Sequence, residues 1–140
     1  MFLRELKSFI LSNRNVGKRN TFQLNEEGID AYIQWAFQRD FLFVVYQNDK
    51  ISGAGISYVI PNKCKGNILD ILPYDQDIEN ETTKDICIMD WIALNPEARN
   101  QLMDKFCLRF PNWENQDKWG IHNGKIKLFP NRYVKNLKLI

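Results

Sequence analysis

Histidine and cysteine are scarce in this sequence, and neither forms the pattern of a metal site or a disulfide scaffold. The chain has one histidine, His122, and three cysteines, Cys64, Cys87 and Cys107. The cysteines are widely spaced, odd in number and without a C-x-x-C pair, so no zinc knuckle or disulfide framework is indicated. We expect reduced structural thiols and no metal site, and the cytoplasm is the compartment that suits such thiols.

A long apolar run is also missing. No stretch approaches the ~20 residues that span a bilayer. The start, Met1–Lys7, carries Glu5 and lacks the apolar core and cleavage site of a secretory signal. We therefore expect no membrane span and a cytoplasmic location. With 44% hydrophobic and 26% charged residues, and with no repeat or linker, the composition indicates one globular domain over residues 1–140.

A strong charge of either sign is absent too, since the net charge is only +2. The charge is uneven: Asp70–Asp90 is rich in acids, and the chain from Lys118 onward has lysines and an arginine but no acid. Such a basic segment could hold phosphates, or it could be ordinary solvated surface. The overall balance is too weak to favour a DNA-binding protein, so nucleic acid is not the expected partner.

Hydrophobic spacing predicts two helices at the start of the chain. Residues 2–12 have apolar side chains at helical intervals. A polar, basic loop, Asn13–Asn20, follows. Asn25 can cap a second helix, which has Glu26 and Glu27 in its first turn. The buried stripe of this second helix is predicted to consist of Ile29, Tyr32, Ile33, Ala36 and Phe37.

Two runs then predict a hairpin. Phe41–Tyr46 is apolar and rich in β-branched and aromatic residues, and Ile51–Ile60 returns after a turn at residues 48–50. Gly53 and Gly55 weaken the second strand unless another element or a ligand must approach closely there. Residues 62–85 are polar and irregular, with a short helix expected near 68–72.

The next strand, Ile86–Ala93, is apolar except for Asp90, and Asn95-Pro96-Glu97 is a compact helix start that leads to a helix ending before Pro111. Lys118–Ile121 and Lys125–Phe129 form a terminal hairpin around Asn123-Gly124. The predicted fold class is α+β, with a mixed, mostly antiparallel central sheet, flanking helices and a C-terminal hairpin. A helix that begins at the end of a strand can bind an anion, so we expect a cofactor pyrophosphate near Pro96.

This order of elements is similar to the GNAT acyltransferase fold, in which a hairpin precedes a central strand and the following helix cradles coenzyme A. Within that superfamily, Ile88–Leu94 resembles the D-W-I-A-P core of the toxin-activating lysine acyltransferases, which transfer a fatty acyl group from acyl carrier protein to lysines of RTX toxins. Leu102–Phe106 and Arg109–Pro111 resemble the family's basic helix and its closing K-F-P-like triplet. The resemblance spans roughly Phe41–Phe129.

Two departures accompany the resemblance. The glycine-rich loop usual in GNAT enzymes is absent, because Asn95–Gln101 contains no glycine, and the toxin-activating family lacks that loop too. The family's catalytic histidine stands in an H-R-N-like triplet near the N-terminus. The best match in this chain is Lys18-Arg19-Asn20, which places Lys18 at the histidine position.

The resemblance implies Asp90 as a catalytic residue that orients the attacking amine or accepts its proton. Lys18 and His122 are further catalytic candidates. The alternatives are that Asp90 ties down a loop, that Lys18 contacts a phosphate or is surface charge, and that His122 is exposed beside a turn. Tyr58 could protonate a leaving thiolate, or it could simply be packed in the sheet. Contacts with the acyl donor are expected from residues around the next helix start, namely Trp91, Ile92, Ala93, Asn95, Ala98 and Arg99.

The function implied is N-acyl transfer from acyl-CoA or acyl carrier protein to a lysine-like amine, with a protein as acceptor and no permanently bound cofactor. A second hypothesis is a catalytically inactive binding or accessory protein of a phage or mobile element, which the missing family histidine supports. A third is modification of a nucleobase amine, supported only by the basic C-terminal segment.

Overall fold

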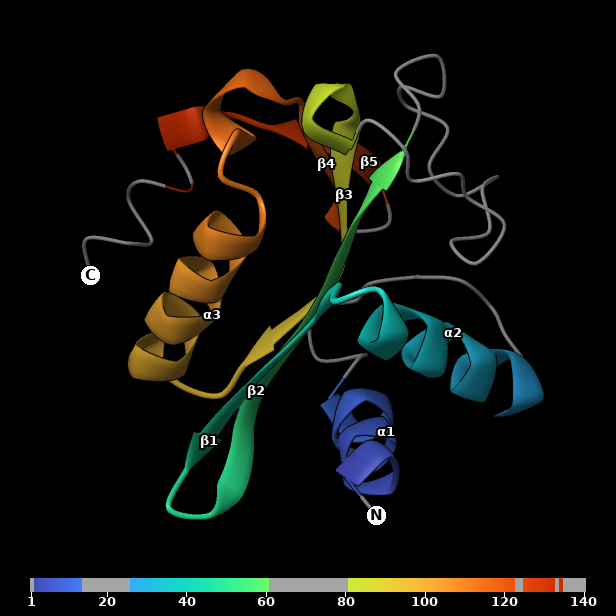
Figure 1. Ribbon diagram of the computed structural model, residues 1–140. Helices are drawn as coiled ribbons and strands as arrows, with labels where there is room; N and C mark the ends of the chain where they lie inside the picture. The colour runs from blue at the N-terminus through green and yellow to red at the C-terminus, as the bar shows by residue number, and fades with distance from the viewer. Residues whose placement is uncertain (1, 14–25, 61–80, 123–124, 133, 135–140) are drawn as a thin grey trace.

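The computed structural model describes residues 2–13, 26–60, 81–122, 125–132 and 134 (Figure 1). Two helices come first, and a hairpin, a third strand, a helix and a final hairpin follow. No described helix is long and apolar enough to cross a membrane. The main elements are α1 (Phe2–Asn13), α2 (Glu26–Gln38), β1 (Leu42–Gln47), β2 (Lys50–Ile60), β3 (Asp85–Ala93), α3 (Pro96–Arg109), β4 (Lys118–His122) and β5 (Lys125–Phe129), with short 3₁₀ turns η5 (Glu81–Thr83) and η6 (Trp113–Asn115).

The five strands form one sheet in the order β1-β2-β3-β4-β5. Every neighbouring pair is antiparallel except β3 and β4, which are parallel and are connected through α3. Helices α1 and α2 cover one face of the sheet and α3 covers the other (Figure 1). The predicted α+β class, with a mostly antiparallel sheet, flanking helices and a C-terminal hairpin, is confirmed.

The buried face of α2 differs from the predicted stripe at one position. Tyr32, Ile33 and Ala36 are buried, as expected, but Phe37 is 52% exposed and Trp35 is buried instead. Trp35 packs its ring against Phe41 and Tyr58, at centroid distances of 5.4 Å in both cases. The stripe is therefore rotated toward the sheet edge, because the large indole fills the space beside the hairpin.

Several other local predictions can be compared with the structure. The hairpin turn is tight, with positive φ at Asn48 and Asp49, as two-residue hairpin loops require. The third strand begins at Asp85, one residue earlier than predicted. The Asn25 cap, the 13–20 loop beyond Asn13 and the short helix near 68–72 lie outside the described residues.

Lys118, the first residue of the basic C-terminal segment, is neither surface charge nor open to a phosphate. Its side chain is 1% exposed. The ammonium donates hydrogen bonds to the carbonyl oxygens of Trp113 and Gln116, both at 2.8 Å, and to Oδ1 of Asn131 at 2.6 Å. Lys118 therefore joins the start of β4 to η6 and to the segment after β5.

The glycines of β2 allow close approach by other elements of the protein. A Cβ atom at Gly55 would lie 2.6 Å from Cε3 of the Trp91 ring, and one at Gly53 would lie 3.1 Å from Cδ1 of Leu102 on α3. Of the two possibilities left open by the sequence, another element or a ligand, the structure shows the first.

Gly55→Ala is expected to lower the free energy of unfolding by about 2 kcal/mol, because the added methyl overpacks the site. The Trp91 ring cannot move away easily, since it packs edge-on against Phe43 and Phe106 at 6.1 and 5.9 Å. Urea unfolding would measure the change. Gly53→Ala is the matched control and should cost less, because its closest contact, Cδ1 of Leu102, is at 3.1 Å and the Ile92 carbonyl is at an ordinary 3.4 Å. Equal costs at the two glycines would contradict this explanation.

Candidate functional site

Strands β3 and β4 run side by side for only a short distance. Their pairing joins Ile86 to Lys118, Cys87 to Trp119 and Ile88 to Gly120. β3 then continues to Ala93 along β2, while β4 continues to His122 along β5. In the described part of the chain, the edge of β3 from Met89 to Ala93 that faces away from β2 therefore has no strand beside it. We call this edge the open edge of β3.

One hydrogen bond fixes the direction of the backbone groups at the end of β3. The N–H of Leu94 donates to the carbonyl of Ser52 on β2 at 2.9 Å. Because these groups alternate in direction along an antiparallel strand, the N–H and C=O of Ile92 also point to β2, and those of Trp91 and Ala93 point to the open edge. Trp91, Ile92 and Ala93 are half-buried. An extended ligand could pair with the edge at Ala93.

Asp90 lies where the two strands diverge, but its carboxylate points toward α2. It is 2% exposed and accepts a hydrogen bond from the hydroxyl of Tyr32 at 2.9 Å. A bulge at Met89 shifts the register with β2 at this point, so that Asp90 pairs with Ile56 and Ile88 with Ser57. Asp90 thus binds helix α2 through Tyr32. It lines none of the three described cavities, which have volumes of about 360, 480 and 270 Å³.

Two further polar side chains lie near Asp90 in the interior. Burial raises the pKa of the Cys87 thiol to about 12, and burial raises the pKa of Tyr58 well above its usual value. The Asp90 carboxylate adds to both shifts. Tyr58 is fully buried and its ring packs against Trp35, so its position matches the packing alternative. Both groups stay protonated near neutral pH.

Alkaline unfolding is expected to depend on Cys87. Its pKa rises from 9.0 to about 12 on folding, so between these values the unfolded chain loses a proton that the folded chain keeps. The free energy of unfolding therefore falls as the pH rises through this window. The Cys87 thiol contributes up to about 1.4 kcal/mol of this fall per pH unit. Cys87→Ala should flatten the fall, as measured by urea unfolding at several pH values from about 8 to 10. The same slope in both proteins would contradict the assignment.

The start of α3 uses most of its backbone donors within the protein. Pro96 has no N–H, the N–H of Ala98 donates to Oδ1 of Asn95 at 2.8 Å, and the N–H of Arg99 donates to the Asn95 carbonyl at 3.1 Å. The Asn95 amide is also hydrogen-bonded to the side chain of Gln47 at the end of β1. The predicted cap is therefore present, but Asn95 and Ala98 are engaged in it and leave few N–H groups for a pyrophosphate.

Two side chains in the next turn of α3 carry buried polar atoms without a hydrogen-bond partner. These atoms are Nε of Arg99 and Oδ1 of Asn100. Leu102, in the same part of the helix, contacts Gly53, which pairs with Ala93 on the open edge. Arg99 and Asn100 therefore lie near the end of β3. Arg99 was predicted to be a donor contact, whereas Asn100 carries no sequence signal and becomes a candidate only through its burial.

The remaining candidates are placed only in part. Lys18 lies outside the described residues. His122 ends β4 and its backbone pairs with Lys125, while its side chain is outside the described set. The last pair between β3 and β4 joins Ile88 to Gly120. Asp90 follows Ile88 by two residues and His122 follows Gly120 by two residues, so these two positions lie on either side of the point where the strands separate. Within the described ranges no three His, Cys, Asp or Glu side chains are grouped as a metal site.

Comparison with protein-family models, with curated proteins and with solved structures finds no match to this chain.

Proposed function

We propose that the chain is an N-acyltransferase with a GNAT-like fold, which transfers an acyl group from acyl-CoA or acyl carrier protein to a lysine-like amine. The observation that supports this most is the early separation of β3 and β4. It leaves a strand edge whose N–H and C=O groups at Ala93 can bind an extended, amide-containing chain. The pantetheine arm common to both donors is such a chain.

Arg99 is proposed to bind the donor's phosphates. Its Nε lies buried in the second turn of α3 without a hydrogen-bond partner, and a guanidinium suits phosphate oxygens. Asn95 and Ala98 then act by fixing the helix start rather than by contacting the donor. Asn100 lies beside Arg99, and its free Oδ1 can accept a hydrogen bond from a donor amide.

In the proposed reaction the amine nitrogen attacks the thioester carbonyl, the C–S bond breaks, the amine loses a proton and the sulfur leaves as a thiol. Asp90 is proposed to accept the proton from the amine and pass it to the departing sulfur, with Tyr32 fixing the orientation of the carboxylate. Because Asp90 is buried, the amine would have to approach it from the open edge of β3. Holding both reactants there would supply much of the acceleration.

Donor binding can be tested by thermal unfolding with CoA, acyl-CoA, acyl carrier protein and pantetheine. A ligand at about a hundredfold its Kd stabilises the fold by about 2.7 kcal/mol, which raises the Tm by roughly 8 °C for a chain of this size. Arg99→Ala should weaken CoA binding about tenfold and leave pantetheine binding unchanged. Ala93→Pro removes the N–H that faces the open edge. It should therefore weaken the binding of both CoA and pantetheine. No shift with any donor would rule the proposal out.

A second candidate is an accessory protein that keeps the fold without catalysis. The burial of Asp90 against Tyr32 favours it, because a structural carboxylate would be held in this way. Donor binding without turnover on any amine would support this candidate over the transferase.

A further inference from the structure

The two edges of the sheet differ in how they are protected. The outer strand β5 has lysines at positions 125 and 127, and charged side chains of this kind discourage pairing with another chain. The other outer strand, β1, reads Leu-Phe-Val-Val-Tyr-Gln, with no charge and no proline. No described strand pairs with its outer side. β1 therefore has the composition of a strand that is paired on both sides.

The outer side of β1 also has backbone groups ready for pairing. The N–H of Ser57 on β2 donates to the carbonyl of Phe41 at 3.0 Å. By the alternation of an antiparallel ladder, the groups of Phe43 and Val45 also point to β2, and those of Leu42, Val44 and Tyr46 point outward. Three residues at alternate positions thus offer an N–H and a C=O each.

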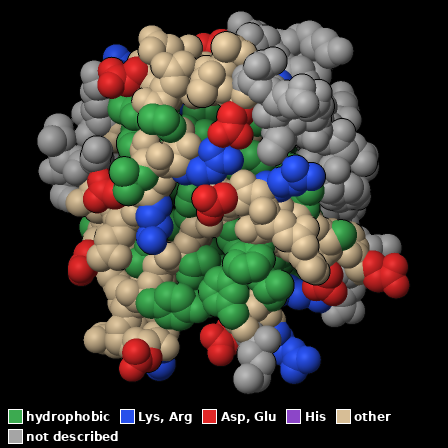
Figure 2. Space-filling model, in the orientation of Figure 1, with side chains coloured by type: hydrophobic (Ala, Val, Ile, Leu, Met, Phe, Trp, Pro, Cys, Tyr) green, Lys and Arg blue, Asp and Glu red, His purple; other side chains and the backbone are tan. Residues whose placement is uncertain are grey.

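Apolar side chains continue from this strand onto the helices. Leu42 and Val44 are half-buried, Tyr46 is 48% exposed, and the exposed ring of Phe37 lies 6.0 Å from that of Phe2. Figure 2 shows hydrophobic side chains gathered on this face over the region of β1 and the adjoining helices. A neighbouring strand would cover part of this surface.

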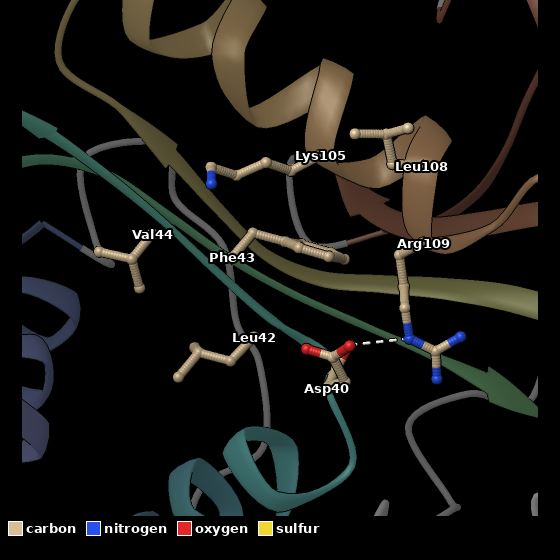
Figure 3. Close-up of a pocket in the computed structure, with 7 residues that line it drawn as sticks. All are labelled: Asp40, Leu42, Phe43, Val44, Lys105, Leu108 and Arg109. Atoms are coloured by element: carbon tan, nitrogen blue, oxygen red, sulfur yellow. Dashed lines mark hydrogen bonds between the residues drawn. The ribbon is translucent and has the colours of Figure 1, made fainter.

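On the other side of the same edge lies a groove of about 360 Å³ between β1 and α3, lined by Leu42, Phe43, Val44, Asp40, Lys105, Leu108 and Arg109 (Figure 3). Arg109 closes one end, since its Nε donates to the Asp40 carbonyl at 2.8 Å and its guanidinium pairs with Glu81. Leu108 is 82% exposed at the rim. The rim is apolar at Leu108 and charged at Lys105.

We propose that two copies of this chain form a symmetric dimer in which β1 of one copy pairs antiparallel with β1 of the other, centred on Val44. This register places the outward-pointing groups of Val44 opposite each other and those of Leu42 opposite Tyr46, so all three residues form ladder hydrogen bonds. The pairing joins the two sheets into one and does not depend on the proposed acyl transfer.

Charge complementarity favours a second copy over other occupants. Each end of β1 has exposed charges of both signs, Arg39 and Asp40 in the turn before the strand and Asp49 and Lys50 at the turn after it. Antiparallel pairing centred on Val44 brings one end of β1 to the opposite end of its partner, so an acid and a base of one copy meet an acid and a base of the other. Above the strands, the exposed Lys105 of α3 lines the groove beside Val44, so each copy adds a base near the axis. Leu108 of both copies lies over the paired strands.

Light scattering after size-exclusion chromatography tests the proposal. The full chain should elute with a mass of about 33 kDa, twice the 16.6 kDa of one chain. Val44→Lys places a lysine on β1, where it should discourage pairing as the lysines of β5 do. This variant should be a folded monomer. Leu128→Lys, at an exposed position on β5, is the matched control and should stay dimeric. A monomeric wild-type protein at about 100 µM, or a dimeric Val44→Lys, would overturn the proposal.

Cysteine cross-linking tests the register and covers the case in which Val44→Lys fails to fold. Residues directly opposite in a ladder have Cα atoms about 5.5 Å apart, which a disulfide can bridge. Val44→Cys should therefore form a covalent dimer on oxidation, while Tyr46→Cys should not, because Tyr46 faces Leu42. The wild-type protein, oxidised in the same way, shows whether the native cysteines form a covalent dimer by themselves. Cross-linking of Tyr46→Cys but not Val44→Cys would refute the register.

Discussion

Lys118→Met is expected to lower the free energy of unfolding by about 4 kcal/mol. The substitution keeps the apolar stem but removes an ammonium that donates to two backbone carbonyls and to Asn131. It leaves the Gln116 carbonyl and Oδ1 of Asn131 without this donor, and each buried acceptor that loses its donor costs about 1–3 kcal/mol. Urea unfolding monitored by tryptophan fluorescence would measure the loss.

Lys127→Met is the matched control for this prediction. Lys127 is exposed on β5, directly beside β4, so its replacement should change stability by no more than about 0.5 kcal/mol. If the two variants were equally stable, the hydrogen bonds of Lys118 would not contribute as inferred. The contrast separates the effect of burial from that of losing one positive charge in this part of the sheet.

Asp90→Asn is expected to lower turnover at least about 100-fold while leaving donor binding unchanged. Asparagine has nearly the same shape and its Oδ1 can still accept the hydrogen bond from Tyr32, but it cannot accept the proton of an attacking amine. Steady-state kinetics with an acyl donor and a lysine-containing acceptor would give the change in kcat, and thermal shifts with CoA would report binding.

Tyr32→Phe distinguishes a positioning role from a catalytic one. Removing its hydroxyl leaves the Asp90 charge in place but frees its orientation, so turnover should fall less than in Asp90→Asn. Donor binding should be unchanged, so the loss should appear in kcat. If Asp90→Asn retained full turnover while donors still bound, the transferase could stand but Asp90 would not be its base. If no donor bound and no turnover occurred, the transferase itself would fall.

The local elements follow from the sequence because their determinants lie within a few residues of each other. The helical spacing in residues 2–12 predicted α1, which ends one residue later, at Asn13. Asn95 caps α3 with Pro96 in its first turn, as its side chain and position predict. The turn at residues 48–50 and the glycine-separated final hairpin are also present. These features require no knowledge of distant contacts.

The orientation of side chains relative to distant elements was not predictable in this way. Phe37 continues the helical stripe in sequence, yet it lies on the surface because Trp35 fills the space beside Phe41 and Tyr58. Lys118 begins a basic segment, yet it is buried because acceptors from η6 and from the residues after β5 converge on it.

The same distinction applies to the candidate site. The sequence singled out Asp90 as an acid in an apolar strand and Arg99 as a cation after it, since both signals are local. Only the tertiary structure decided that Asp90 faces Tyr32, that β3 and β4 pair over three residues and then separate, and that Asn100 has a buried free oxygen. Strand pairing and helix packing join residues tens of positions apart, and local propensity does not specify which surfaces those contacts leave open.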